Sequence, residues 1–336
     1  MSFNLTPRSV TSITHQRLSF AGGGTDFADY YKEYEGAVLC ATIDKYIYVT
    51  VKKHSPLFNE AYRLSYFETE HVNSLNEIKN DIARECLKLI SIDPPLHIST
   101  SADLPASSGL GSSSSFAVGL LHALHTMKGE KISSGQLAEE ACHVEINMLY
   151  KPIGKQDQYA VALGGLNFLQ FNKNSRVMID HIWEPESGSG FLFKDLLLFW
   201  TGLQRNAEDI LLEQKNKIIN KTDSLHTIKN LAYDLRDIIL NPDQDTQKIG
   251  EILDKNWAIK KGLSSNISNE FIDNCYKKAL KAGAYGGKIA GAGGGGFLML
   301  FADKRNKKNI IDALPELIYT PIKFEPKGTE LLSTIY

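Results

Sequence analysis

The sequence predicts an α+β fold in two parts, and three features of the chain support this. From Arg8 to about Arg176, strand-like and helix-like segments are mixed along the chain. The stretch Glu184–Gly190 is polar and rich in turn-forming residues, which is typical of an exposed connection. Several helices follow it, and strand-like segments return near the C-terminus. We therefore expect an N-terminal domain at residues 1–183 and a C-terminal domain at residues 190–336.

Side-chain periodicity predicts the elements of the first half. Val38–Val51 and Ala61–Phe67 are strand-like, and Leu96–Ser101 alternates apolar and polar residues as a half-buried strand does. Glu77–Ile90 is typical of a helix, which must end before Pro94 because proline cannot continue a helix. A further helix is predicted downstream by apolar residues at helical spacing, namely Phe116, Val118, Leu120, Leu121, Leu124 and Met127.

The second half is expected to be richer in helix. Leu192–Thr201 resembles a strand, and strand-like segments return near Gly286–Phe301 and Leu317–Phe324. Between them, a helix that should stop at Asn241-Pro242 is predicted by Leu225, Ile228, Leu231, Leu235, Ile238 and Ile239.

Composition narrows the class of protein. The chain has 336 residues, 43% of them apolar, which is enough for one large or two modest cores. A net charge of −2 gives no electrostatic reason to expect nucleic acid or an anionic membrane as a partner.

Residues 1–8 lack the pattern of a secretion signal, so we expect a cytoplasmic protein. Cys40, Cys86, Cys142 and Cys275 form no Cys-x-x-Cys motif and are expected to be buried thiols. A homo-oligomer is left open.

The segment Pro105–Ser115 carries the strongest functional signal. It contains one proline, two glycines and six serines in eleven residues, between a predicted strand and a predicted helix. Gly109 and Gly111 can adopt backbone angles that are closed to other residues, and free amides at a helix start favour an anion. The alternative is a loop whose serines only cap the helix. We favour a phosphate-binding loop.

Other phosphate-binding motifs do not fit. A Walker A loop needs Gly-Lys-Ser/Thr, whereas Gly286-Gly-Lys-Ile289 ends in isoleucine. The run Gly291–Gly296 satisfies Gly-x-Gly-x-x-Gly, but the strand-like Phe297–Phe301 follows it where a dinucleotide fingerprint needs a helix. The His-Arg-Asp and Asp-Phe-Gly triplets of protein kinases are missing from the sequence.

Three blocks together resemble the GHMP kinases, the superfamily of galactokinase, homoserine kinase, mevalonate kinase and phosphomevalonate kinase. Pro105–Ser115 matches the superfamily pattern Pro-x-x-x-Gly-Leu-Gly-Ser-Ser, and Arg17–Asp26 and Lys288–Phe297 fall in the expected order and spacing. The resemblance implies an N-terminal domain of ribosomal-protein S5-like fold and a ferredoxin-like C-terminal domain, with the active site in the cleft between them. It also implies ATP and Mg²⁺ as cofactors.

The resemblance also implies the nucleotide and metal ligands. Mg²⁺ prefers hard oxygen ligands, and the family pattern gives the hydroxyl of Ser113 and the carboxylate of Glu145, on a helix that Ser133–Gln136 is expected to cap. Without the family match, Glu145 would be taken as a solvated helix residue. The implied nucleotide-binding residues are Pro105, Ser107, Ser108, Gly109, Leu110, Gly111, Ser112, Ser113 and Ser114.

Asp157 is the candidate catalytic base, because it corresponds to the aspartate of the Asp-Gln pair in galactokinase-like and mevalonate-kinase-like enzymes. It could accept the proton of the attacking hydroxyl. The resemblance places Arg17 beside it, where a guanidinium keeps the carboxylate ionised and neutralises charge on the phosphoryl group. The alternatives are an Asx-turn residue for Asp157 and a solvent-facing strand arginine for Arg17.

The expected sugar site lies on two glycine-rich segments. Gly24, Thr25 and Asp26 are expected to bind sugar hydroxyls, although three consecutive glycines could equally form a flexible hairpin. Gly293 and Gly294 are expected to bring the backbone close to the phosphates and the sugar. A phosphate on the sugar would need a second anion site, for which the candidates are Lys155, Lys288 and, by preference, Arg205 at a predicted helix start.

The first glycine block indicates a branch of the superfamily. Gly22-Gly-Gly-Thr-Asp26, where galactokinases carry Gly-Glu-His-x-Asp, is similar to D-glycero-D-manno-heptose 7-phosphate kinases and fucokinase-like enzymes. We therefore expect an ATP-dependent kinase that phosphorylates the anomeric hydroxyl of D-glycero-α-D-manno-heptose 7-phosphate, giving the 1,7-bisphosphate of a nucleotide-activated heptose pathway. The alternatives are a fucokinase-like or other hexose 1-kinase, and a non-catalytic sugar sensor. Retention of Asp157, Glu145, Ser113 and Arg17 argues against the sensor.

Overall fold

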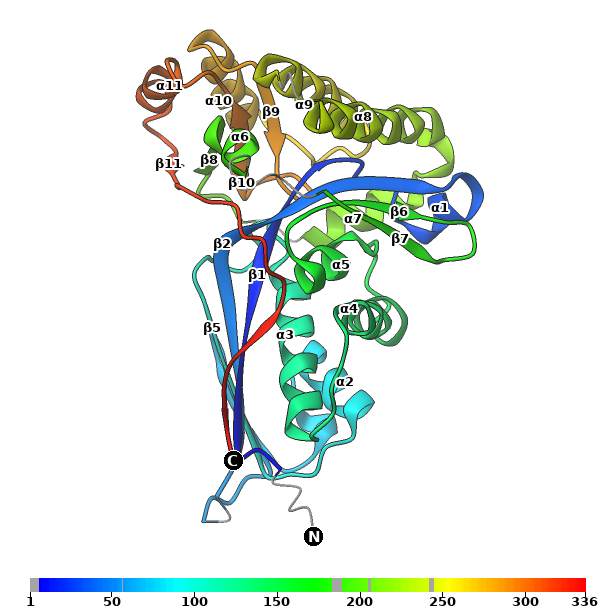
Figure 1. Cartoon of the computed structure of the whole chain (residues 1–336), viewed down its shortest axis with the longest axis vertical. Coiled ribbons are helices and arrows are strands. Elements are labelled where there is room, and N and C mark those ends of the chain that lie inside the picture. Colours follow the sequence, from blue (N-terminus) through cyan, green and yellow to red (C-terminus); the bar gives the residue numbers. More distant parts are fainter. Residues whose placement is uncertain (1–5, 56, 183–188, 205–206, 242–244) are drawn as a thin grey trace.

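The computed structural model describes residues 6–55, 57–182, 189–204, 207–241 and 245–336, arranged around two sheets (Figure 1). The strands are β1 (Ser9–Ala21), β2 (Gly36–Lys53), β3 (Tyr62–Ser65), β4 (Thr69–Val72), β5 (Leu96–Ala102), β6 (Leu166–Phe171), β7 (Val177–His181), β8 (Leu196–Trp200), β9 (Gly286–Ile289), β10 (Phe297–Phe301), β11 (Ile318–Tyr319) and β12 (Glu330–Ile335). The α-helices are α1 (Ala28–Tyr34), α2 (Asp81–Ile90), α3 (Ser112–Met127), α4 (Ser134–Cys142), α5 (Gln156–Leu163), α6 (Ser189–Lys194), α7 (Ala207–Asn216), α8 (Thr222–Leu240), α9 (Thr246–Lys260), α10 (Glu270–Lys281) and α11 (Lys307–Ala313). Shorter helical turns are η1 (Leu75–Glu77), η2 (His143–Met148) and η3 (Ile219–Lys221).

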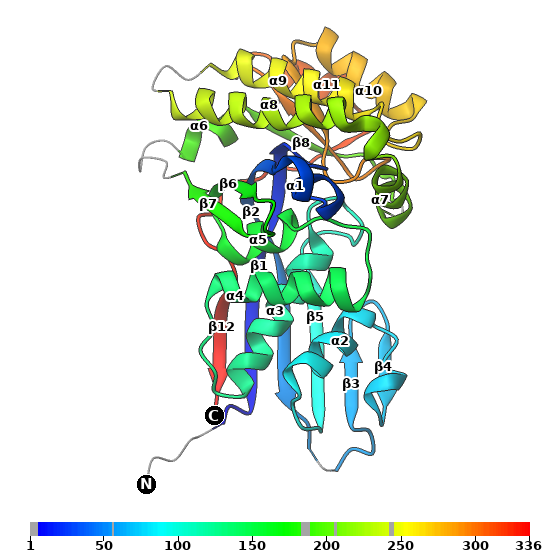
Figure 2. The same ribbon diagram turned by 90° about the vertical axis from the view of Figure 1, so that its right-hand side faces the viewer.

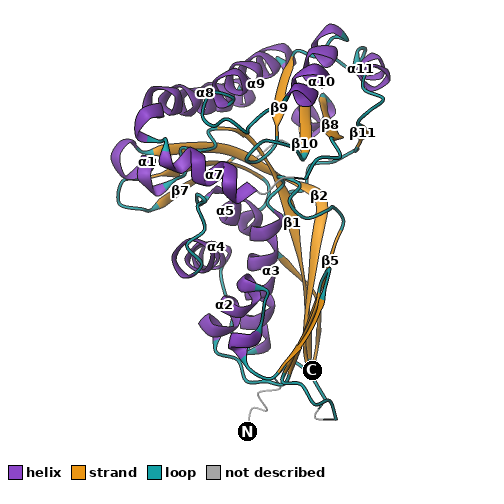
Figure 3. Ribbon diagram, turned by 180° about the vertical axis from the view of Figure 1, so that it is seen from behind, coloured by secondary structure: helices purple, strands orange, loops and turns teal. Residues whose placement is uncertain are grey.

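The first sheet has eight strands and is organised by the long strand β2. The order is β12-β1-β2-β5-β3-β4, and β6 pairs with β2 and with β7. With 18 residues, β2 is long enough to pair with β6 near its start and with β5 near its end. Helices α2, α3 and α4 cover one face of this sheet (Figures 2 and 3).

Helix α3 lies very close to β1, and a glycine permits the approach. A Cβ atom on Gly119 would lie 2.7 Å from the hydroxyl oxygen of Thr14. The hydroxyl of Ser12 donates a hydrogen bond of 2.7 Å to the Gly119 carbonyl. The middle of α3 is thereby fixed over the strand that carries Arg17.

The second sheet has four antiparallel strands in the order β11-β8-β10-β9. Because side chains alternate along a strand, Leu197 and Leu298 enter a core with α10 and α11, whereas Leu198 and Met299 face the opposite way. That opposite core also contains Phe20 of β1 and Phe168 of β6, together with residues of α8 and α9. The two sheets therefore share one apolar core, which fixes their relative position. Helices α8 and α9 run side by side at the end of the molecule (Figure 2).

The last strand leaves the second sheet and returns to the first. β12 pairs antiparallel with β1, with Ser9 opposite Ile335 and Ile13 opposite Glu330. The C-terminal end of the chain thus completes the N-terminal sheet. The predicted boundary at residues 184–190 falls largely outside the described residues and stays a prediction.

Three predicted elements differ from the structure. Glu77–Ile90 is two elements, because the Glu77 carboxylate accepts the Ser74 amide in the capping box of η1 and Asn80 then caps α2. The predicted strand Leu192–Thr201 begins inside helix α6, and only β8 is extended. Leu317–Phe324 contains the short strand β11 and an isolated bridge at Phe324, because Pro321 lacks the N–H that a continuous strand needs.

All four cysteines are buried and free, as predicted. Among the helices that the structure describes, none is both long and apolar enough to cross a bilayer.

Candidate active site

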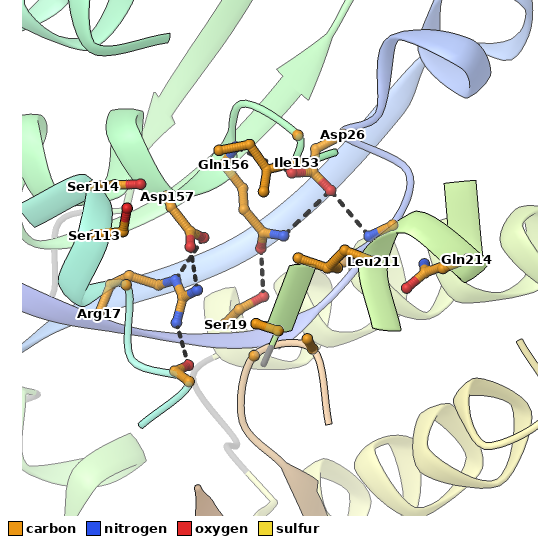
Figure 4. A pocket seen from close by; sticks show the side chains of 18 of the residues that line it. Arg17, Ser19, Asp26, Ser113, Ser114, Ile153, Gln156, Asp157, Leu211 and Gln214 are labelled. Carbon is orange, nitrogen blue, oxygen red and sulfur yellow. Dashed lines mark hydrogen bonds and ion pairs between the residues drawn. The ribbon is translucent and has the colours of Figure 1, made fainter. Parts of the chain in front are cut away.

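A cavity of about 230 Å³ lies where the glycine–serine loop, β1 and the second sheet meet, and Figure 4 shows side chains that line it. Helices α5, α7 and α9 contribute other walls. The lining residues are Arg17, Ser19, Gly23, Gly24, Asp26, Phe27, Ser107, Ser108, Gly109, Gly111, Ser112, Ser113, Ser114, Glu145, Lys151, Ile153, Gly154, Gln156, Asp157, Ala207, Glu208, Leu211, Gln214, Asn256, Lys260, Lys288, Gly291 and Ala292.

The glycine–serine loop adopts left-handed backbone angles at three positions. The φ angles are 58° at Ser107, 81° at Gly109 and 80° at Gly111, and the carbonyl of Leu110 accepts a hydrogen bond of 3.0 Å from the Arg17 amide. Helix α3 has no side-chain cap at its start. The helix-capping alternative for the serines is therefore wrong, and the first residues of α3, Ser112–Ser114, line the cavity.

The C-terminal glycine block supports this loop through backbone contact. A Cβ atom on Gly109 would lie 2.7 Å from the Ala290 carbonyl oxygen, and one on Gly291 would lie 2.6 Å from that of Gly109. Gly296 packs still more closely on the Ser108 carbonyl, since a Cβ atom there would lie 2.3 Å from its oxygen. Only glycine permits two backbones to approach in this way at positive φ.

Several residues predicted to bind the nucleotide or the sugar do not line the cavity. Gly293 and Gly294 pack on the loop at Ile267, whose carbonyl accepts the Gly294 amide at 2.7 Å. Gly291 and Ala292 line the cavity in their place. Pro105 and Leu110 lie outside the lining, with Leu110 fully buried. Arg205 is outside the described residues.

Arg17 and Asp157 form a side-on ion pair in the cavity wall. The guanidinium Nε and Nη2 donate to the two carboxylate oxygens at 2.8 and 2.5 Å, and Nη1 donates to the Gly109 carbonyl at 2.8 Å (Figure 4). Arg17 is 3% exposed, so the solvent-facing alternative is wrong. Each oxygen of Asp157 keeps a lone pair, and its side chain is 26% exposed. One cation thus ties the loop to the carboxylate.

Glu145 is fully buried beside the start of α3, so it is not a solvated helix residue. Ser133 caps α4 as predicted, and the helix continues as the π-helical turn η2 that carries Glu145. Ser113 and Ser114 donate to its two carboxylate oxygens at 2.5 and 2.7 Å, and Gln158 donates at 2.7 Å. Burial raises the pKa of Glu145, while these hydrogen bonds act in the opposite direction.

Asp26 lies opposite the ion pair and is held by three donors. The amides of Gly24 and Gln156 donate at 3.0 and 3.2 Å, and the Gln156 side chain donates at 3.2 Å. Ser19 orients that side chain by donating to its Oε1 at 2.8 Å (Figure 4). Gln156 and Ser19 were not predicted, although Gln156 adjoins the predicted base.

Thr25 does not reach the cavity. Its hydroxyl donates to the carbonyls of Gly22 and Ala37 and accepts the Ala37 amide, and its side chain is fully buried. This arrangement anchors the glycine segment to β2, so the hairpin alternative for the segment does not hold. Gly24 does line the cavity, next to Gln214 of α7.

We predict a pH-dependent contribution of Asp26 to stability. Burial, and secondly the charge of Asp157, raises the pKa of Asp26 from 3.8 to about 6. The folded protein therefore takes up a proton there at a higher pH than the unfolded chain. The stability of the wild type relative to Asp26→Asn is expected to rise as the pH falls from about 7 to 4, by up to about 3 kcal/mol. Urea unfolding at stepped pH measures this, and a difference that stays constant or falls would contradict the assignment.

Two family models match the chain. The model of the GHMP kinases N terminal domain matches residues 75–165, and the GHMP kinases C terminal model matches residues 231–320. The chain belongs to the GHMP kinases. This confirms the predicted two-domain kinase fold and the class of enzyme, a phosphotransferase with an alcohol group as acceptor. ATP is the phosphoryl donor expected for this family.

Named relatives of this GHMP kinase act on several substrates. The D-glycero-alpha-D-manno-heptose 7-phosphate kinase of Campylobacter jejuni is 35% identical over 91% of this chain and 93% of its own length. A galactokinase of Pyrococcus furiosus is 26% identical over 91% and 92%. The crystal structure of a D-glycero-D-manno-heptose 1-phosphate kinase from Bacteroides thetaiotaomicron has a TM-score of 0.79 at 25% identity, covering 97% of this chain and 99% of that one.

Proposed function

We propose that this GHMP kinase transfers the γ-phosphoryl group of ATP to the anomeric hydroxyl of D-glycero-α-D-manno-heptose 7-phosphate. The observation that carries the kinase chemistry is the Asp157 carboxylate, held by Arg17 between the phosphate-binding loop and Asp26. The choice of sugar is supported by the relative that is 35% identical over nearly the whole chain.

The geometry gives each group a step in the transfer. The sugar hydroxyl would lie between Asp26 and Asp157, and its oxygen forms a bond to the γ-phosphorus while the bond to the β-phosphate oxygen breaks. Asp157 accepts the hydroxyl proton, because its oxygens keep free lone pairs towards the cavity. Arg17 neutralises charge that builds up on the phosphoryl group. Its hydrogen bond to the Gly109 carbonyl also fixes the position of the loop relative to the base. The β-phosphate oxygen keeps the electron pair of the broken bond, and ADP leaves.

The cavity also contains oxygen ligands that suit Mg²⁺. Glu145 is a buried carboxylate whose direct partners are neutral donors, and the Ser113 hydroxyl lies 2.5 Å from one of its oxygens. A hard divalent cation prefers this set, completed by water and phosphate oxygens. In the described part of the chain no cluster of three or more His, Cys, Asp or Glu side chains forms a metal site. From the hard oxygen atoms of this pair we infer that Ser113 and Glu145 hold a nucleotide-bound Mg²⁺, which would neutralise the phosphates.

Ser113→Ala and Glu145→Gln are each expected to raise the Mg²⁺ concentration needed for half-maximal activity by about tenfold or more. The double variant should be little worse than either single one, because both residues act on one ion. Ser115→Ala is the matched control, since its hydroxyl donates to the His15 carbonyl and lies outside the cavity. Metal titrations that superimpose for the wild type and all four variants would contradict the proposed metal ligands.

The substrate is tested by comparing turnover of heptose 7-phosphate, free heptose, fucose and galactose with ATP. We expect kcat/KM for heptose 7-phosphate to exceed that for free heptose by at least about tenfold, because a charge-assisted contact to phosphate is strong. An equal or higher kcat/KM for an unphosphorylated hexose would overturn the choice of sugar and leave the kinase chemistry in place.

A further inference from the structure

Two lysines that no part of the proposed chemistry uses lie in the cavity wall. Lys260 is the last residue of α9 and Lys288 is on β9, so both come from the second sheet and its helices. They are 6% and 2% exposed, and both line the cavity. Lys260 carries no motif that would single it out in the sequence.

Neither lysine has a carboxylate partner in the described part of the chain. Lys260 donates to the Gly291 carbonyl, and Lys288 donates to the Phe20 carbonyl at 2.9 Å. Each ammonium group has three donors and uses one in these bonds. The other cations of the wall are neutralised differently, since Arg17 binds Asp157 and Lys151 lies 3.6 and 3.5 Å from carboxylate oxygens of Asp81 and Glu208.

Two buried charges without a paired carboxylate are costly. Burial lowers the pKa of Lys260 to about 8, with the charge of Arg17 adding to the effect and the charges of Asp26 and Asp157 opposing it. For Lys288 burial again dominates the lowering, and the charges that act on it are those of Lys260 and Arg17. An anion bound between the two ammonium groups would remove this penalty.

A neighbouring side chain also has an unused polar atom. Asn256 lies one helical turn before Lys260, lines the cavity and donates to the Phe20 carbonyl at 3.4 Å. Its Oδ1 is buried without a hydrogen-bond partner. The same wall therefore offers two cations for an anion and an acceptor for a hydroxyl.

We propose that Lys260 and Lys288 bind a phosphate ester group in the cavity, and that this group is the phosphate of the sugar substrate remote from the reacting hydroxyl. This assignment of the source rests on the proposed function. The nucleotide phosphates already have the loop amides, the start of α3 and the Ser113–Glu145 pair, whereas a sugar phosphate has no other cation without a partner among the described residues that line the cavity. Two cations also match the charge of a phosphate dianion.

The site can be tested without turnover, using inorganic phosphate as the probe. The thermal midpoint of unfolding is measured against phosphate concentration, at constant ionic strength, with and without saturating Mg²⁺ and a non-hydrolysable ATP analogue. The variants are Lys260→Met and Lys288→Met, with the Gln variants retaining a donor for the two carbonyls. Lys155→Met is the matched control, because Lys155 is paired with Glu139 and lies outside the cavity.

We expect phosphate to stabilise the wild type and the control in the presence of the nucleotide analogue, and each cavity variant to need at least about tenfold more phosphate for the same shift. A second outcome is that the cavity variants lose the phosphate-induced shift only in the absence of the analogue, and also bind the analogue more weakly. That outcome would overturn the sugar as the source and identify the nucleotide as the source of the phosphate ester. Equal phosphate titrations for the wild type and all cavity variants would overturn the site.

Kinetics separate this proposal from the proposed function. If heptose 7-phosphate is the substrate, Lys288→Met should raise its KM by about tenfold or more while the KM for ATP changes less than about threefold. If heptose 7-phosphate is not turned over, the proposed function fails, and the phosphate titration still decides whether the two lysines form an anion site.

Discussion

Asp157→Asn is expected to lower kcat by roughly 10²–10⁴-fold, the usual effect of removing a positioned base. An amide keeps the size of the side chain and can still accept one hydrogen bond from Arg17, but it cannot take up the hydroxyl proton. The KM values for ATP and sugar should stay within a few-fold of the wild type. Steady-state kinetics on the purified variant, with circular dichroism to confirm folding, measure this.

A control separates loss of the base from loss of an ion pair. Asp303 is bound by Arg305 through both carboxylate oxygens, at 3.3 and 3.0 Å, outside the cavity. Asp303→Asn should leave kcat unchanged. An Asp157→Asn enzyme that turns over within a few-fold of the wild type would show that the carboxylate orients Arg17 and is not the base.

Gly296→Ala is expected to lower both the stability of the protein and its affinity for ATP. Its Cβ atom would overlap the Ser108 carbonyl oxygen, and its φ of +80° disfavours any L side chain. Strain and overpacking together should lower the free energy of unfolding by about 2–5 kcal/mol. Because Ser108 must move, the KM for ATP should rise by about tenfold or more.

Gly202 supplies the matched control for that methyl group. It has a φ of +73°, but a Cβ atom there would meet nothing within 4 Å. Gly202→Ala should therefore cost only about 1–2 kcal/mol of stability, from the backbone angle alone. Denaturant unfolding and ATP saturation curves compare the two variants. Equal effects on the KM for ATP would mean that contact between the glycine block and the loop does not position the nucleotide.

The sequence motifs identified the residues that lie on short, locally encoded segments. The loop Pro105–Ser115 could be predicted as a phosphate-binding loop from its composition, because few structures other than an anion site need so many glycines and serines between a strand and a helix. The role of Ser113 as a metal ligand came from the family resemblance. Arg17, Glu145 and Asp157 required the family resemblance. Each taken alone has an ordinary structural explanation, and nothing local shows that β1, η2 and α5 meet at one cavity.

The residues that the sequence did not reveal depend on long-range packing. Asn256 and Lys260 lie on a helix that reaches the cavity only because two sheets share a core. In the sequence, a lysine at a helix end is typical of a solvated residue. The prediction that Thr25 binds the sugar was wrong for the opposite reason. Its hydroxyl is a plausible sugar ligand in the sequence, but in the fold it donates hydrogen bonds to the backbone carbonyls of Gly22 and Ala37.

The misassigned element Leu192–Thr201 has a similar explanation. A short apolar segment fits a buried helix as well as a buried strand, so periodicity cannot find where one gives way to the other. In the structure Asp195 separates α6 from β8, and its carboxylate accepts a hydrogen bond of 2.7 Å from Thr246 at the start of α9. That partner is 51 residues away in the chain.

The most direct test of the account is identification of the product formed from ATP and D-glycero-α-D-manno-heptose 7-phosphate by phosphorus and proton NMR. We expect a second phosphorus resonance coupled to the anomeric proton, with loss of the reducing end and release of ADP in equal amount. Phosphorylation at any other hydroxyl, or no turnover of this sugar by an enzyme that phosphorylates galactose or fucose, would contradict it.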